Sequence, residues 1–135
     1  MKKTLLLFLL FFISCNDQKE LSTNFNINEI KDGVIYEANI RQYSESGKFK
    51  DFTKDIYKLK DLGVKIIWLM PIHPISKTNR KGTLGSYYSI SDYKAVNPEF
   101  GNKDDLDELI KEAHKHGMLV ILDWVANHTG WDHKW

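Results

Sequence analysis

Residues 118–129 read Met-Leu-Val-Ile-Leu-Asp-Trp-Val-Ala-Asn-His-Thr, and this stretch decides the fold. Its first five residues are an apolar run that follows Gly117, which is typical of a strand buried on both faces in a parallel sheet. Asp123, Asn127 and His128 follow where the strand leaves the core. These polar residues either form a site at the carboxyl end of a barrel strand or make an ordinary polar turn, and the stretch alone leaves both interpretations open.

A helix is predicted immediately before this strand. Asn102 is suited to cap it, with Asp104 and Asp105 in the first turn, where acidic side chains are favoured. Gly117 is expected to end the helix. Its buried stripe is predicted to be Leu106, Leu109, Ile110 and Ala113.

A similar unit is predicted further towards the amino terminus. Residues 34–40 and 64–70 have the pattern of strands, and a loop is expected over 71–101. Between the strands, apolar residues recur at spacings of three and four, which predicts one helix ending at Gly63. These residues are Phe49, Phe52, Ile56 and Leu59.

The order strand, helix, strand, helix, strand predicts right-handed βαβ units and therefore an α/β fold. Either a doubly wound sheet or a TIM (β/α)8 barrel begins in this way. The first strand is not followed by a glycine-rich phosphate turn, which favours the barrel. A barrel has eight strands and typically ~250 residues. The 135 residues are therefore expected to be a fragment that carries about the first three βα units.

Composition and spacing exclude several classes of function. A formal net charge of +1 argues against a nucleic-acid partner, because such proteins normally carry a basic patch or stripe. No His-Glu-x-x-His spacing is present for zinc. His114 and His116 are two residues apart on a predicted helix, so they do not face the same way.

The amino terminus is predicted to be an export signal. Lys2 and Lys3 precede an apolar run that is too short to span a bilayer, which needs ~20 residues. Residues 1–15 resemble a bacterial lipoprotein signal in which Cys15 becomes lipidated, although Phe12 stands where Leu is usual; the alternative is an ordinary signal with a free cysteine. Residues 16–32 are expected to be a flexible tether and residues 33–135 the barrel domain. The protein is then exported and lipid-anchored to the cell envelope, at the outer membrane or the periplasmic face.

Four stretches together resemble the α-amylase family of glycoside hydrolases. Residues 123–128 (Asp-Trp-Val-Ala-Asn-His) resemble the first conserved region of that family. Residues 36–43 and 63–72 resemble its first two barrel strands and the loops that follow them. Residues 85–101 resemble the loop before its second helix. The four matches are collinear and cover nearly everything from Gly33 onward.

The resemblance implies a role for each matching residue. His128 corresponds to the histidine that hydrogen-bonds the sugar at the cleavage position, and Tyr88 to the tyrosine that stacks on it, with Tyr87 as the alternative. Asp123 and Asp92 are expected to orient the site. Asn127 corresponds to a ligand of a structural Ca²⁺ in many relatives, and its amide oxygen suits that hard cation.

The resemblance further implies an enzyme that cleaves α-1,4-linked glucans such as starch and maltodextrins by a retaining mechanism. The nucleophilic Asp and the acid/base Glu are expected beyond Trp135, so the fragment itself is predicted to be inactive. Ser86 departs from the histidine found in many α-amylases, and the wording of this loop is closer to neopullulanases and cyclomaltodextrinases. A transglycosylase or isomerase of the family, or a non-catalytic glycan-binding lipoprotein, stays open as an alternative.

Overall fold

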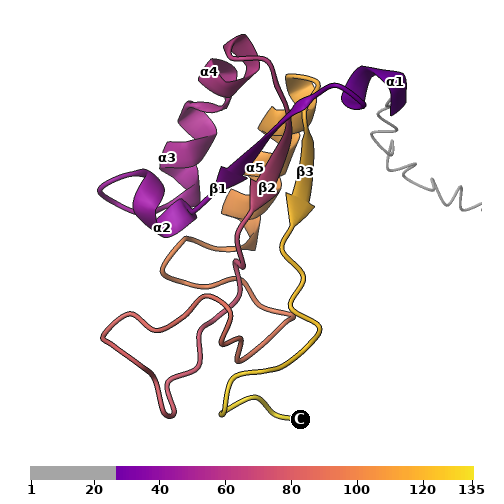
Figure 1. Cartoon of the computed structure of the whole chain (residues 1–135). Coiled ribbons are helices and arrows are strands. Elements are labelled where there is room, and N and C mark those ends of the chain that lie inside the picture. Colours follow the sequence, from indigo (N-terminus) through magenta and orange to yellow (C-terminus); the bar gives the residue numbers. More distant parts are fainter. Residues whose placement is uncertain (1–26) are drawn as a thin grey trace, which may run out of the picture.

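The computed structural model describes residues 27–135 and contains three strands with helices between them (Figure 1). The predicted signal, Cys15 and most of the predicted tether lie outside the described residues. The end of the tether segment forms one helical turn. None of the helices within 27–135 is long and apolar enough to cross a membrane. In chain order the elements are α1 (Ile27–Ile30), β1 (Val34–Ala38), α2 (Ile40–Tyr43), α3 (Phe49–Lys54), α4 (Ile56–Asp61), β2 (Val64–Leu69), α5 (Lys103–Lys115) and β3 (Leu119–Leu122).

The three strands form one parallel sheet in the order β1-β2-β3. The register pairs Ala38 with Leu69 and Leu69 with Leu122, so the three strands end at the same edge. This is the arrangement that consecutive βαβ units produce, and it confirms the predicted α/β class. Because the carboxyl ends of the strands lie together, the loops that follow them meet on one side of the molecule (Figure 1).

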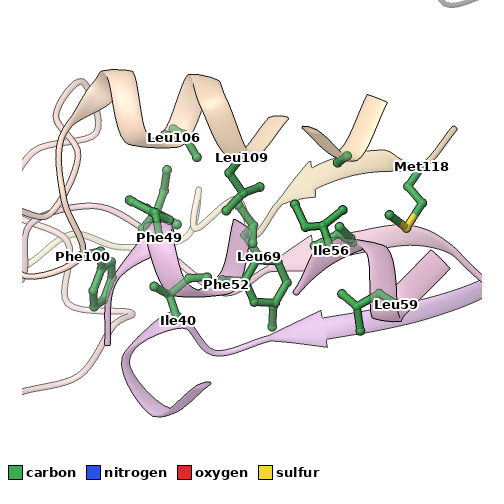
Figure 2. Close-up of a cluster of buried hydrophobic side chains, with 14 of the residues drawn as sticks. Ile40, Phe49, Phe52, Ile56, Leu59, Leu69, Phe100, Leu106, Leu109 and Met118 are labelled. Atoms are coloured by element: carbon green, nitrogen blue, oxygen red, sulfur yellow. The ribbon is translucent and has the colours of Figure 1, made fainter. Parts of the chain in front are cut away.

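A single hydrophobic core lies between the helices and the sheet (Figure 2). The predicted apolar stripe of the first helical segment is buried in it: Phe49, Phe52 and Ile56 have no exposed surface. Phe52 also contacts the ring of Tyr43 edge-on at 4.7 Å. The predicted stripe of α5 is confirmed in the same way, with Leu106, Leu109 and Ala113 buried and Ile110 packed against the cluster.

The first helical segment is two helices rather than the single one predicted. It breaks at Asp55, whose backbone angles (φ −101°, ψ 1°) leave the helical region. The Asp55 carboxylate accepts a hydrogen bond from the Tyr43 hydroxyl at 3.0 Å and forms an ion pair with Lys58 at 2.7 Å. These two contacts also hold the pKa of Asp55 below its ordinary value, with Lys58 the larger cause. Contacts with a side chain twelve residues away therefore accompany the break.

The start and end of α5 agree with the prediction. The Asn102 side chain accepts from the backbone N–H of Asp105 at 3.0 Å, and the Asp105 carboxylate accepts from the N–H of Asn102 at 3.1 Å. This reciprocal pair is a capping box that satisfies two backbone donors at the helix start. Gly117 follows the helix with φ 70°, a left-handed conformation that suits glycine.

Strand β3 is less buried than its apolar sequence predicts. Ile121 is 43% exposed and Leu122 is 45% exposed. Within the described residues, β3 is an edge strand, and its only neighbour in the sheet is β2. Ile121 pairs with Trp68, on the face of the sheet opposite the core residues Ile67 and Leu69. The expectation of burial on both faces is wrong for this part of the chain. Ile121 lies on the face that the described helices leave open, whereas Leu122 pairs with Leu69 on the core face and is exposed at the end of the edge strand.

Candidate active site

The polar residues singled out from the sequence lie at the carboxyl ends of the strands. The loop from 70 to 102 follows β2, and residues 123–135 follow β3, and the two segments run together beyond the sheet (Figure 1). The N–H of Gly130 joins them by donating to Ile90 O at 2.7 Å, and the N–H of Asp123 donates to Leu69 O, at the end of β2, at 2.9 Å. The site is therefore built from two segments that are distant in sequence.

Tyr88, Asp123 and His128 are brought together in this region. The Tyr88 hydroxyl donates to the Asp123 carboxylate at 3.0 Å, and the imidazole Nε2 of His128 lies 3.1 Å from the backbone oxygen of Tyr88. Partial burial raises the pKa of the Tyr88 phenol, and its hydrogen bond to Asp123, the charge of Asp123 and the charge of Glu37 raise it further. Glu37 lies near the end of β1, so all three strands contribute to this electrostatic environment.

Contacts on both ring nitrogens fix the His128 imidazole. The Tyr88 carbonyl can only accept, so Nε2 carries the proton in that contact, and Nδ1 accepts from the amide nitrogen of Asn127 at 3.2 Å. The Tyr93 hydroxyl donates to the backbone oxygen of His128 at 2.7 Å and also to that of Val125. The imidazole is therefore held in a fixed orientation at the surface, and a ligand reaches a ring nitrogen by sharing or replacing one of these two contacts.

Tyr87 and Tyr88 face different surroundings, which separates the two candidates for sugar stacking. The Tyr87 ring lies under the guanidinium group of Arg41, at 4.5 Å from ring centroid to Cζ, and 6.5 Å from the ring of Phe100. Arg41 also pairs with Glu99 at 2.9 Å. Tyr87 is thus occupied by packing, whereas Tyr88 is 37% exposed beside Asp123. Asp92, the other predicted orienting residue, accepts from the N–H of Lys94 at 2.8 Å within its own turn.

Asn127 has the chemistry of a calcium ligand but cannot form a site by itself. Its amide nitrogen is used by His128, and its amide oxygen accepts no hydrogen bond within the described residues, so the oxygen is free for a cation. Ca²⁺ takes about six to eight oxygen ligands. Residues 27–135 contain no group of three or more His, Cys, Asp or Glu side chains placed to hold a metal. The remaining ligands of any such site would have to come from elsewhere in the protein.

Asp132 joins the two loops at a position that the sequence did not mark. Its carboxylate accepts from the backbone N–H groups of Thr78 and Lys77, at 3.0 and 2.7 Å. These two hydrogen bonds, that of Thr78 first, lower the pKa of Asp132 to about 2. The carboxylate is therefore ionised at neutral and mildly acidic pH, and the contact is lost only as the pH falls from about 4 towards 2.

Comparison with known proteins decides the family. A family model described as the α-amylase catalytic domain matches residues 15–135. The chain belongs to the α-amylase family. This membership supports the predicted TIM-barrel class, and the parallel sheet of three strands is consistent with the start of such a barrel.

Relatives of this α-amylase-family chain include enzymes of several specificities. It is 40% identical over 107 residues to alpha-amylase SusG of Bacteroides thetaiotaomicron, covering 76% of this chain and 14% of that protein. It is 38% identical over 110 residues to an oligo-1,6-glucosidase of a Bacillus species, covering 78% and 20%. The chain spans less than a quarter of the length of such curated relatives.

Solved structures give the same result. An alpha-amylase from Lactobacillus plantarum superposes with a TM-score of 0.76 at 48% identity, covering 78% of this chain and 25% of that chain. A noncanonic maltogenic alpha-amylase, AmyB of Thermotoga neapolitana, gives 0.74 at 42% identity, covering 78% and 26%.

Proposed function

We propose that these residues are the amino-terminal part of a longer glycoside hydrolase that cleaves α-1,4-linked glucans such as starch and maltodextrins. The observation that carries the proposal is the arrangement of Tyr88, Asp123 and His128 at the carboxyl edge of the sheet, in a chain that belongs to the α-amylase family. In a barrel enzyme, this edge is where substrate binds. The short coverage of the relatives supports the view that the natural chain continues past Trp135.

In this proposal the described residues bind and orient the sugar. The half-exposed ring of Tyr88 offers a flat apolar surface to the C–H face of a pyranose, and Asp123 fixes that ring through the phenol hydroxyl. The His128 imidazole supplies a hydrogen-bonding group at the same place once a sugar hydroxyl replaces the Tyr88 carbonyl or the Asn127 amide as its partner. Tyr93 positions His128 by holding its backbone oxygen. Together these groups would hold one sugar ring rigidly, which supplies part of the barrier reduction through orientation.

The reacting groups are proposed to lie outside the 135 residues. A retaining glycosidase needs two carboxyl groups about 5 Å apart, one as nucleophile and one as acid/base. Among residues 27–135, Asp123 is the one carboxylate hydrogen-bonded to Tyr88 or His128, and that bond gives it a positioning role. We therefore propose that the nucleophilic Asp and the acid/base Glu follow Trp135, and that residues 1–135 alone do not hydrolyse glycosides.

A substrate panel with the full-length protein tests this proposal. We expect maltoheptaose and soluble starch to be hydrolysed at least roughly tenfold faster than isomaltose, because a tenfold preference needs only about 1.4 kcal/mol of differential binding in the transition state. Faster cleavage of isomaltose would contradict the α-1,4 assignment. The same panel run with a chelator tests the proposed structural calcium at Asn127: activity should fall and return on addition of Ca²⁺.

An isomerase is the second candidate, because trehalulose synthase MutB is among the similar structures at 33% identity. The amylase structures are more similar, at 48% and 42%, which favours hydrolysis of glucans. In the panel, conversion of sucrose to an isomer without release of glucose from maltoheptaose would favour the isomerase. Binding of maltoheptaose without cleavage would favour the glycan-binding lipoprotein.

We further propose that the protein is exported and anchored at the bacterial cell envelope through lipidated Cys15. The basic residues, the short apolar run and the cysteine that follows it support this location. Labelling of the full-length protein with radioactive palmitate should be lost in Cys15→Ala, and labelling that persists in this variant would contradict the anchor.

A further inference from the structure

The side chain of Trp131 lies on the surface and has no partner among the described residues. It is 78% exposed, and within residues 27–135 its indole makes neither a hydrogen bond nor a ring contact. The other exposed tryptophans pack against Tyr93, Trp124 at 5.5 Å and Trp135 at 5.8 Å between ring centroids. A single exposed hydrophobic side chain is ordinary on a protein surface, so Trp131 is a candidate binding surface because of the backbone that holds it and the polar pocket beside it.

The backbone on each side of Trp131 is held firmly. Before it, the N–H of Gly130 donates to Ile90 O at 2.7 Å, and a Cβ at Gly130 would lie 2.4 Å from the Cβ of Ser76. After it, Asp132 accepts from two backbone N–H groups of the loop 76–78. The close approach of Ser76 means that only glycine fits at position 130. A Trp ring presented on a fixed backbone loses little conformational entropy when a ligand binds.

A small pocket opens beside this ring. It has a volume of about 200 Å³ and is lined by Ser76, Asn79, Arg80, Lys81, Ser86, Ser89 and Trp131. This is smaller than the ~300 to 1,000 Å³ of typical drug-sized sites, and it suits a single ring. One flat apolar wall with a polar rim is the combination that a pyranose needs, since its C–H face is apolar and its hydroxyls both donate and accept.

The polar rim contains both occupied and free groups. Arg80 is used by the protein, since its Nε donates to Ser76 O at 2.9 Å and its Nη2 to Ile75 O at 3.1 Å. The side chains of Asn79, Lys81 and Ser89 form no hydrogen bond to other residues of the described chain. They offer an amide that donates and accepts, an ammonium donor and a hydroxyl. A neutral polyol can hydrogen-bond to all three groups. The guanidinium of Arg80 already donates to backbone oxygens, which argues against a site dedicated to an anion.

The pocket borders the candidate active site along both chain segments. Ser86 and Ser89 flank Tyr88, and Trp131 follows His128 by three residues. The Ser86 hydroxyl also accepts from the N–H of Tyr88 at 3.2 Å. We propose that Trp131, with Asn79 and Lys81 at its rim, forms a second sugar-binding position that holds another pyranose unit of the same glucan chain. This inference rests on the proposed function, because Tyr88 and His128 are taken to hold the first unit.

The test compares substrates of different length with the full-length protein. In Trp131→Ala, we expect the KM for maltoheptaose to rise roughly fivefold to tenfold, the scale of one aromatic contact, with kcat unchanged. Hydrolysis of α-glucosyl fluoride, whose single ring can occupy only one of the two positions, should change less than about twofold. Trp131→Phe keeps a ring and should recover most of the loss. Leu84→Ala, at an exposed residue of the neighbouring loop after β2, is the control and should behave as wild type.

Several outcomes would overturn the inference. These are an unchanged KM for maltoheptaose, an equal loss on the short and long substrates, or stronger binding of inorganic phosphate than of maltoheptaose that is lost in Trp131→Ala. If the wild-type protein hydrolyses neither substrate, the proposed function fails, and calorimetric titration with maltoheptaose still decides the second position. Binding that weakens in Trp131→Ala and recovers in Trp131→Phe would support it, and equal binding by all three proteins would refute it.

Discussion

Replacing His128 with alanine in the full-length protein should lower kcat/KM for maltoheptaose roughly 100-fold to 1,000-fold. Hydrogen bonds to the sugar that strengthen in the transition state of a glycosidase supply several kcal/mol, and each 1.4 kcal/mol or so is a factor of ten in rate. The imidazole is oriented for such a bond by Asn127 and by the Tyr88 backbone. Because the side chain is at the surface, its loss should cost little folding stability.

Steady-state kinetics and thermal melting together check this expectation. His116→Ala is a matched control, since His116 lies at the end of α5, pairs with Glu112 at 3.0 Å and is remote from the carboxyl edge of the sheet. That variant should retain activity within about twofold. His128→Asn, which keeps a hydrogen-bonding group, should fall between alanine and the wild type. A His128→Ala protein with normal kinetics would remove His128 from the site.

Replacing Phe52 with alanine should destabilise the barrel domain by about 3 to 5 kcal/mol, the usual cost of deleting a large aromatic side chain from a core. Phe52 is fully buried at the centre of the helix–sheet core and contacts the rings of Tyr43 and Tyr36 (Figure 2). The core has no way to fill such a large space without moving α3 against the sheet, so the cavity term adds to the lost transfer energy.

Urea unfolding of the full-length protein measures this loss. Tyr57→Ala is the control on the neighbouring helix α4, because Tyr57 is half exposed and its removal should change stability by no more than about 0.5 kcal/mol. A loss below about 1 kcal/mol for Phe52→Ala would show that this core is not the one that holds the domain together.

The parts of the fold that depend on local chemistry could be predicted from the sequence. The cap at Asn102, the end of α5 at Gly117 and the apolar stripes at spacings of three and four all follow from contacts within a few residues, and the structure agrees with them. The parallel order of the strands followed from the glycine-ended helices between them.

Features that depend on distant contacts could not be predicted. The break at Asp55 is stabilised by Tyr43, and the Asp132 carboxylate accepts from backbone N–H groups more than fifty residues away. Arg41 lay within a stretch that resembled the family, but its position over Tyr87 emerges only when the loops after β1 and β2 meet. The exposure of Ile121 likewise depends on which elements cover the second face of the sheet, and no local pattern encodes that.

The structure brings Tyr88, Asp123 and His128 together, as follows from their places in the loops after adjacent strands, and their roles toward a sugar stay predictions. The sequence already favours Tyr88 over Tyr87, and the structure adds a physical reason, since Tyr87 lies under Arg41 and Tyr88 is hydrogen-bonded to Asp123. The contribution of Tyr93, which holds the backbone of His128, gave no separate signal in the sequence beyond its place after Asp92.

The most direct test of the central claim is a crystal structure of the full-length protein with a bound maltooligosaccharide. We expect one pyranose ring stacked on the ring of Tyr88, with a hydroxyl at about 2.6 to 3.2 Å from the His128 imidazole. A sugar bound at the carboxyl edge of the sheet that touches neither Tyr88 nor His128, or a sugar bound only elsewhere on the protein, would contradict it.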